Sequence, residues 1–370
     1  MDYREIVETY AALEGTTKRL ELTAMLVDLF EKVRGDEIKR GVYLTQGKLG
    51  PDYLGLEAGI GEKLIIKAIG ESMGIADKKV QEEYRRLGDL GSVAEVLSER
   101  RAQRTLFSEL LTVERVFENL HRMAEKSGSG AQREKLNLLE ELLNDCSGAE
   151  AKYLIRTLTG KARLGIADMT LLDALAIAFS EGDREGVERA YNLCSDLGRI
   201  AEMLCKSGKK GIENIGIEVG IPIRAMLAER LSTPEEILEK MRGRCAVEYK
   251  YDGLRIQAHV GDGEVKLFSR RLEDLTSQFP DVKEELLKSF RGEKGLIEGE
   301  CVVVNPDTGE MLPFQQISHR RGRKYGLEEA IEEYPVTLFL FDCLYDGKDL
   351  TRINYRERRK RLRNITEEGE

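Results

Sequence analysis

Apolar residues recur at helical spacing through roughly the first 214 positions of the chain. Ile6, Tyr10 and Leu13 fall on one helix face, while Glu, Lys and Arg fill the other faces. Further stretches with this spacing are 80–99, 106–126 and 133–143. The pattern predicts an all-α region over residues 1–214.

The pattern changes after residue 210. Residues 215–223 (IGIEVGIPI) are rich in β-branched side chains and contain a proline, which a helix disfavours. We therefore place a domain boundary near residue 214 and a second domain over 215–370. Thr233 and Pro234, followed by two acidic residues, predict a helix start inside it.

Alternation with period two indicates a sheet in this second domain. In 254–260 (LRIQAHV) apolar and polar residues alternate, and 245–247 (CAV) is short and strand-like. Asp262 and Gly263, between two alternating runs, predict a β-hairpin. Residues 336–345 (VTLFLFDCLY) are almost continuously apolar, which predicts a central strand buried on both faces.

Composition narrows the class of protein. A chain of 370 residues, with 41% hydrophobic and 34% charged residues, fits a two-domain globular protein, and high Glu, Lys and Arg content without tryptophan is compatible with a thermophile. Six scattered cysteines without a CxxC pair argue against zinc and disulfides, and fit a reducing cytosol. No apolar run is long enough for a membrane span, and the charged N-terminus is unlike a signal peptide. A cytoplasmic location is expected.

The net charge of −9, taken alone, argues against a nucleic-acid partner. Two basic clusters qualify this, at 319–324 (HRRGRK) and 352–363 (RINYRERRKRLR). Either cluster by itself is typical of a solvated surface. Two of them beside a nucleotide motif favour contacts with phosphates.

Lys250 is the candidate nucleophile. It precedes Asp252 and Gly253, which predict a turn into the strand that follows. A lysine at such a corner, partly desolvated and next to other cations, can lose its proton near neutral pH and attack an electrophile. A solvated turn is the alternative, and it is the better interpretation of the tetrapeptide in isolation.

An acidic pair and two aromatic residues supply further candidates. Glu298 and Glu300 are two residues apart in an apolar run, so one strand face carries both, and the pair can serve a divalent cation or a cationic partner. A solvent-facing edge strand is the alternative. Phe339 and Phe341 lie in the apolar run 336–345, where aromatic side chains usually belong to the core.

Two glycine-rich turns interrupt the helical region. Gly59 and Gly61 precede a predicted helix, whose free backbone N–H groups suit a phosphate. The turn at 159–165 (TGKARLG) combines two glycines with Lys161 and Arg163, which suits a DNA phosphate. Ordinary loops between helices explain both turns about as well.

In combination, these motifs resemble a known family. KYDGLR at 250–255, EGE at 298–300 and FD at 341–342 occur in the order and spacing of ATP-dependent DNA ligases, the archaeal and eukaryotic replicative type most closely. Residues 47–68 (GKLGPDYLGLEAGIGEKLIIKA) are similar to part of that family's DNA-binding domain. The resemblance implies a multidomain fold, with an all-α DNA-binding domain before a partial α+β nucleotidyltransferase (adenylation) domain built on an antiparallel sheet.

The resemblance also implies roles for single residues. Lys250 matches the lysine that becomes linked to AMP, and Arg255 completes that motif in the nucleotide site. Arg270 matches an arginine directed at the nucleotide. Glu300 matches the acidic residue of the ATP and metal site, and Glu298 either supports it or flanks it.

Recognition of adenine is implied for two further positions. Glu248 matches the residue that contacts the adenine amino group. Phe341 matches the aromatic residue that stacks on the base, with Phe339 on the same side as the second choice.

The implied partner is nicked double-stranded DNA, held through its backbone and minor groove. Lys48, Lys63, Lys161 and Arg163 are the candidate contacts. ATP is the implied AMP donor, with Mg²⁺ as the metal. A monomer, a sliding clamp as partner, and work in DNA replication, repair and recombination complete the expectation.

The sequence departs from the family pattern at its end. A later acidic metal ligand, a paired-lysine motif and an OB-fold domain are not visible before residue 370, which predicts a truncated ligase without full sealing activity. Two other classes stay open. One is an RNA ligase or capping enzyme, which the long helical region argues against, and the other is a non-catalytic DNA-binding fragment with a vestigial nucleotide site.

Overall fold

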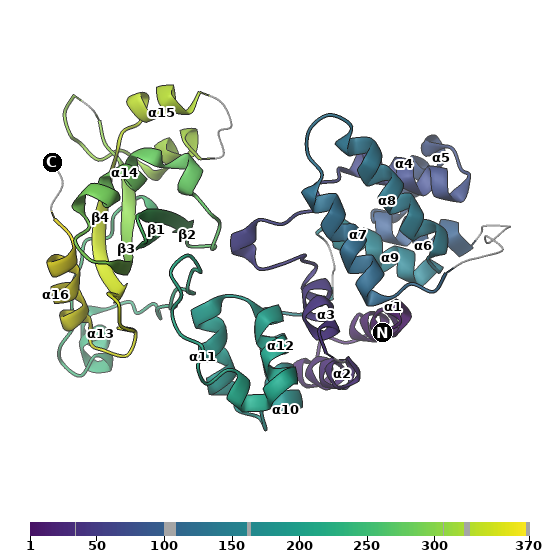
Figure 1. The fold of residues 1–370 in the computed structure, drawn as a ribbon, viewed down its shortest axis with the longest axis horizontal. Helices are drawn as coiled ribbons and strands as arrows, with labels where there is room; N and C mark the ends of the chain where they lie inside the picture. The colour runs from purple at the N-terminus through teal and green to yellow at the C-terminus, as the bar shows by residue number, and fades with distance from the viewer. Residues whose placement is uncertain (34, 100–108, 161–163, 306, 322–325, 368–370) are drawn as a thin grey trace. The chain divides into compact units, whose positions relative to one another are not determined.

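The computed structural model (Figure 1) describes residues 1–33, 35–99, 109–160, 164–305, 307–321 and 326–367. By their contacts the residues form two units. The helical unit comprises 1–191 and 196–215, and the sheet unit comprises 192–195 and 216–370. Buried apolar side chains fill the interior of each.

The described residues up to Ser207 are mostly helical, as the spacing of their apolar residues predicts, although the predicted helix 106–126 is helical only from Val113 among its described residues. Its helices are α1 (Tyr3–Leu13), α2 (Arg19–Lys32), α3 (Glu37–Gln46), α4 (Glu62–Met73), α5 (Asp77–Leu87), α6 (Leu90–Glu99), α7 (Val113–Glu125), α8 (Ala131–Asp145), α9 (Gly148–Leu158), α10 (Asp168–Phe179), α11 (Arg184–Cys194) and α12 (Leu197–Ser207). On α1, the predicted face of Ile6, Tyr10 and Leu13 is buried.

One predicted helix is two helices. The run 80–99 is divided because Gly88 adopts a left-handed conformation (φ 69°) and ends α5, after which α6 begins at Leu90. Glycine reaches that conformation without steric cost, so it is a common helix terminator. Periodicity alone does not reveal such a break, because the apolar spacing continues across it.

Four antiparallel strands form the sheet, in the order β2-β1-β3-β4. They are β1 (Leu254–Gly261), β2 (Glu264–Ser269), β3 (Lys294–Val303) and β4 (Val336–Tyr345). The predicted hairpin joins β1 to β2 through Asp262 and Gly263, whose positive φ angles of 54° and 76° suit a type I′ turn. The remaining helices are α13 (Pro234–Lys240), α14 (Pro280–Ser289), α15 (Leu327–Glu333) and α16 (Tyr355–Ile365).

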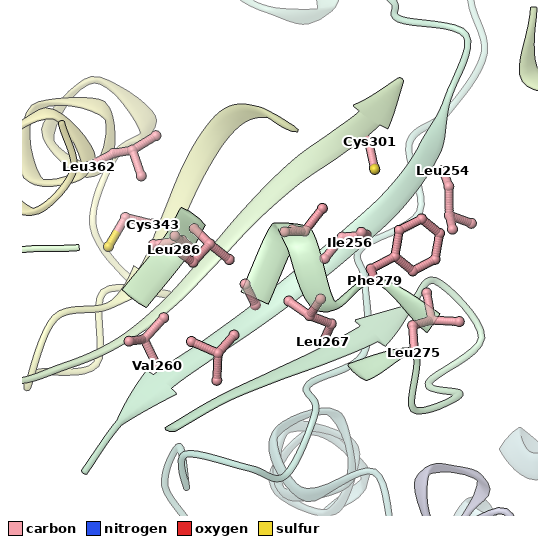
Figure 2. Close-up of a cluster of buried hydrophobic side chains, with 14 of the residues drawn as sticks. Leu254, Ile256, Val260, Leu267, Leu275, Phe279, Leu286, Cys301, Cys343 and Leu362 are labelled. Atoms are coloured by element: carbon pink, nitrogen blue, oxygen red, sulfur yellow. The ribbon is translucent and has the colours of Figure 1, made fainter. Parts of the chain in front are cut away.

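The hydrophobic core of the sheet unit lies against one face of the sheet (Figure 2). On β1 the alternate residues from Leu254 to Val260 point into it, and Leu286 of α14 and Leu362 of α16 pack against the same cluster. The intervening β1 residues, Arg255, Gln257 and His259, therefore belong to the opposite face. Alternation along β1 thus separates a core face from a polar face.

Two strand predictions are wrong. Residues 244–250 have no regular secondary structure; no described strand pairs with them, and Val247 is 91% exposed. The apolar run 336–345 does form β4, but at an edge of the described sheet, with Cys343 as its only buried residue. Apolar composition reports a preference for burial, whereas the number of neighbouring strands depends on the rest of the fold.

Two polar side chains of β1 tie the segment 216–223 to the sheet. The backbone N–H of Gly220 donates to Nδ1 of His259 at 3.0 Å, and that of Ile223 donates to Oε1 of Gln257 at 2.8 Å. Burial, reinforced by the positive charge of Lys266, lowers the pKa of His259 to about 3. The imidazole is therefore neutral at pH 7, as an acceptor at Nδ1 must be.

This buried histidine predicts acid sensitivity. Its folded-state pKa lies below the ordinary value of 6.5, so its contribution to stability is complete above about pH 6.5 and is lost as the pH falls towards 3. The slope is up to about 1.4 kcal/mol per pH unit. His259→Asn keeps an acceptor for Gly220 and should lack this slope in urea unfolding between about pH 4 and pH 7. Equal slopes in both proteins would contradict the assignment.

Candidate active site

An ion pair between a buried carboxylate and a partly exposed guanidinium lies on the polar face. Nη2 of Arg255 is 2.5 Å from Oε2 of Glu298, and Nε2 of Gln257 donates to the other carboxylate oxygen at 3.1 Å. Glu298 is only 4% exposed. An ionised carboxylate at that depth needs such partners, because burial removes its hydration. The prediction that Glu298 and Glu300 share one face of a strand is met in β3.

Glu300 lies directly opposite Arg255 in the β1–β3 register and is half-buried. Burial raises the pKa of the Glu300 carboxyl, although the charges of Arg255 and Lys250 and a hydrogen bond from the Gly253 backbone oppose the rise. The carboxylate is thus held near cationic groups at an incompletely solvated position. A cation arriving there would find a ready ligand.

Lys250 differs from expectation in its surroundings. The lysine does lie just before β1, and Asp252 begins the turn, where its carboxylate accepts a hydrogen bond from the Phe314 N–H at 3.1 Å. The side chain of Lys250 is exposed, however, so the predicted partial desolvation is absent. The physical reason is that residues 244–250 have no strand neighbour among the described residues to cover them.

Gly253 has a steric reason to be glycine. A Cβ atom there would lie 2.4 Å from the carbonyl oxygen of Cys301 and 2.9 Å from Cγ of Glu300. The turn after Lys250 can therefore approach β3 only without a side chain. This close approach brings the backbone N–H of Gly253 to the Glu300 carboxylate.

A bulge in β4 brings aromatic rings to the same face. Glu298 pairs with Asp342 and Gly299 with Leu340, so Phe341 is an extra residue in β4. The guanidinium of Arg255 lies over the Phe341 ring, 5.1 Å from its centroid. Phe339, opposite Glu300 in register, stacks on Tyr251 with 4.2 Å between ring centroids.

Glu248 is hydrogen-bonded to Tyr355, the first residue of α16. Its carboxylate accepts a hydrogen bond from the hydroxyl of Tyr355, which also lies 3.1 Å from the Phe341 carbonyl oxygen. Burial, followed by the negative Glu248, raises the pKa of Tyr355, so the phenol keeps its proton. Tyr355 thereby connects α16 to both predicted adenine contacts.

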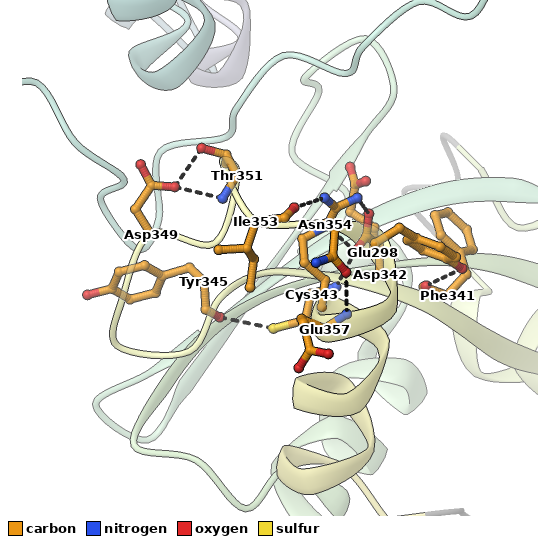
Figure 3. A network of polar contacts seen from close by, with 12 residues as sticks. Glu298, Phe341, Asp342, Cys343, Tyr345, Asp349, Thr351, Ile353, Asn354 and Glu357 are labelled. Carbon is orange, nitrogen blue, oxygen red and sulfur yellow. Dashed lines mark hydrogen bonds and ion pairs between the residues drawn. The ribbon is translucent and has the colours of Figure 1, made fainter. Parts of the chain in front are cut away.

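The edge strand β4 is braced by α16 (Figure 3). Arg358 forms a two-pronged ion pair with Asp342, at 2.8 and 2.9 Å, and donates to the Ile353 carbonyl at 2.7 Å. Asn354 caps the start of α16. Asp342 follows Phe341, the extra residue of the bulge. The Arg358–Asp342 ion pair therefore fixes β4 next to the position from which the Phe341 ring projects. Sequence reasoning named Asp342 only as part of the FD motif and placed Tyr355 and Arg358 only in a basic cluster. It assigned none of the three a role of its own, although the acidic residue inside an apolar strand was a usable signal.

Some members of the two basic clusters form contacts within the sheet unit, but Arg352, Arg356 and Arg363 are exposed, so the predicted phosphate contacts stay a prediction. Arg320 is fully buried and forms a two-pronged ion pair with Asp281. Arg321 pairs with Glu273, and Arg359 of α16 donates to the Leu340 carbonyl at 2.8 Å. Charge counts in sequence do not show that the partners of these cations lie within the same unit.

Arg270 follows the last residue of β2, and its side chain is exposed. The register pairs Ser269 with Ile256, so Arg270 and Arg255 lie at the same end of the sheet. No contact joins Arg270 to the ion pair of Arg255 in the described residues. Its predicted role at the nucleotide stays a prediction.

Two of the four candidate DNA contacts lie among the described residues of the helical unit. Lys48 pairs with Asp52 at 2.6 Å, and Lys63 is exposed in the first turn of α4. Lys161 and Arg163 lie outside the described residues. Lys135, which sequence reasoning missed, is buried and donates to the carbonyls of Ala58 and Gly59, at 2.8 and 3.1 Å. It holds in place the turn that opens α4.

Within the described ranges, no group of three or more His, Cys, Asp or Glu side chains is placed to hold a metal ion. None of the described helices has the length and apolar character needed to cross a bilayer.

Comparison with known proteins gives consistent matches. The model for "DNA ligase N terminus" matches residues 2–176, and that for "ATP dependent DNA ligase domain" matches 225–370. "DNA ligase 2" of Korarchaeum cryptofilum is 45% identical and "DNA ligase 2" of Thermofilum pendens 47% identical, each over 100% of this chain and 63% of the relative. "DNA ligase" of Saccharolobus solfataricus is 45% identical over 99% of this chain and 62% of its own. The chain thus spans less than two thirds of the length of these relatives.

The raised pKa of Glu300 predicts a stabilising substitution. A carboxyl whose folded-state pKa lies above its ordinary value gives its full stability at low pH and loses it as the pH rises through the folded value. Glu300→Gln is neutral throughout, so its denaturation midpoint should exceed that of the unsubstituted protein at pH 7. The difference should shrink towards about pH 4. A lower midpoint at pH 7 would show that the attraction to Arg255 and Lys250 outweighs the burial.

Proposed function

This chain belongs to the ATP-dependent DNA ligases, and from that premise we propose that it forms a covalent lysine–AMP at Lys250 and passes the AMP to a DNA nick. The observation that carries the proposal is the arrangement on β1 and β3. Lys250 lies four residues before the start of β1, the strand whose Arg255 meets Glu298 and faces Glu300. A fixed cation and an acidic ligand thus lie on two paired strands, and the proposed nucleophile precedes the first of them in the chain.

The proposed reaction has three displacements at phosphorus. The neutral amine of Lys250 forms a bond from Nζ to the α-phosphorus of ATP, pyrophosphate leaves with the electron pair of the broken P–O bond, and Nζ releases one proton to solvent. A 5′-phosphate oxygen at the nick then attacks the same phosphorus, which breaks the P–N bond and returns the lysine. Finally the 3′-hydroxyl attacks the activated 5′-phosphorus, and AMP leaves. Each step develops negative charge that fixed cations stabilise.

The residues around Lys250 have matching roles in this proposal. Arg255 is held by Glu298, so its positive charge is available without reorganisation. Phe341, whose ring lies beside the Arg255 guanidinium, would stack on adenine, and Glu248 would offer a carboxylate to the adenine amino group. Arg270, at the same end of the sheet, adds a second cation.

The described residues fit Mg²⁺ as the metal of this reaction. Magnesium in nucleotide sites commonly takes one or two carboxylates and completes its octahedron with phosphate oxygens and water. Glu300, half-buried beside Arg255, would be the carboxylate. When bound, Mg²⁺ would neutralise negative charge on the phosphate oxygens of the nucleotide.

Nicked duplex DNA is the proposed substrate, and the helical unit is the proposed grip on it. Lys48 and Lys63 flank the glycine-rich turn that Lys135 holds, which supports backbone contacts there. Lys161 and Arg163 complete the proposed contact set. A monomeric chain and a sliding clamp as partner belong to the same proposal.

Covalent labelling tests the chemistry. With α-labelled ATP and Mg²⁺, the protein should gain an acid-labile AMP, and Lys250→Ala should gain none. Lys288→Ala, which removes an exposed lysine of α14, should label like the unsubstituted protein. Label on Lys250→Ala would exclude this lysine as the nucleophile. A folded, unlabelled wild type that binds nicked duplex would reduce the function of the chain to DNA binding.

A further inference from the structure

Gln257 lies inside the sheet unit, between the candidate active site and the segment 216–223. The side chain is buried and uses every hydrogen bond that a glutamine amide can form. Oε1 accepts from the Ile223 N–H at 2.8 Å and lies 3.0 Å from Nε2 of His259. Nε2 donates to the Ile223 carbonyl and to the Glu298 carboxylate, both at 3.1 Å.

His259 determines which way this amide faces. Because Nδ1 of His259 accepts from the Gly220 N–H, the ring proton is on Nε2 and is donated to Oε1 of Gln257. A reversed amide would direct its NH₂ at two N–H groups and its oxygen at the Ile223 carbonyl and the Glu298 carboxylate. All four contacts would be repulsive, so the buried site admits one orientation.

The consequence extends to Arg255. Oε1 of Glu298 is occupied by Gln257, which leaves Oε2 for the guanidinium of Arg255 at 2.5 Å. The guanidinium then lies over the ring of Phe341. A long, flexible arginine is ordered by a carboxylate only when the carboxylate itself has one position. The chain of contacts therefore runs from the backbone of 220–223 to the cation beside Lys250.

We propose that Gln257 is a positioning residue of the adenylation site. Together with His259 it fixes the Glu298 carboxylate, and this aims Arg255 at the phosphates of the nucleotide. The inference rests on the proposed function of the site. Gln257 itself contacts neither Lys250 nor the nucleotide in this assignment; it acts through Glu298.

The order of the Arg255 side chain is tested on the nucleotide-free protein. In ¹⁵N spectra of the arginine side chains, Arg255→Lys identifies the Arg255 signals, and hindered rotation should resolve its Nη groups in the wild type. Gln257→Leu should average these signals. Ile256→Val, which disturbs the core on the opposite face of β1, is the matched control and should leave them resolved. Resolved Arg255 signals in folded Gln257→Leu would overturn the inference, whatever the labelling experiment shows.

The effect on chemistry is measured as the single-turnover rate of AMP attachment. Gln257→Leu should lower the rate at saturating ATP by about tenfold to a hundredfold, the usual cost of a misplaced catalytic group, while Ile256→Val stays near the wild-type rate. A loss confined to the KM for ATP would contradict positioning. Absence of label in the wild type itself would refute the proposed function, and the spectra would still decide the role of Gln257.

A double-mutant cycle separates positioning from mere anchoring of the segment 216–223. Glu298→Gln removes the charge that holds Arg255 but leaves Gln257 bonded to Ile223. If Gln257 acts through Glu298, adding Gln257→Leu to Glu298→Gln should slow AMP attachment little further. Multiplicative losses from the two substitutions would assign Gln257 a purely structural role and overturn the inference.

Discussion

A carboxylate removed from water must find charge and hydrogen bonds elsewhere, and in the sheet unit Glu298 imposes this requirement. Arg255 and Gln257 meet it from the neighbouring strand. The register of β1 against β3 is consequently specified by polar contacts on one face as well as by apolar packing on the other. A slip of one residue would direct Arg255 into the core and leave Glu298 unpaired.

On the same face, β4 shows how an edge strand can hold its side chains in defined positions. β4 has one described neighbour and two irregular positions, yet Phe341 lies under Arg255. The Arg358–Asp342 ion pair fixes the strand beside the bulge, and Tyr355 holds the Phe341 carbonyl region. Helix α16 thus compensates for the ordering that a second strand would have provided. Arg358 and Arg359 of this helix contact the protein's own backbone carbonyls and the carboxylate of Asp342.

Positions suited to chemistry are poorly satisfied in isolation. Glu300 is partly desolvated without a bound cation, and its raised pKa records that cost. Lys250 projects into solvent although Gly253, three residues later, is pressed against β3. The burial of the Glu300 carboxyl therefore reduces stability, which is common for charged groups at a binding site.

The sequence by itself determined the class of each segment and the local geometry. Helical spacing identified the residues that α1 buries, Asp262-Gly263 identified the hairpin, and the separation of Glu298 and Glu300 placed both on one face, because all of these depend on neighbours along the chain. Only the tertiary structure decided that 244–250 lacks a partner strand, that β4 is an edge, and that Arg320 is buried against Asp281. Those outcomes depend on which distant segments meet. The role of Gln257 is of the same kind, since its four hydrogen bonds go to three residues of β1, β3 and the segment 216–223, and no local pattern brings these residues together.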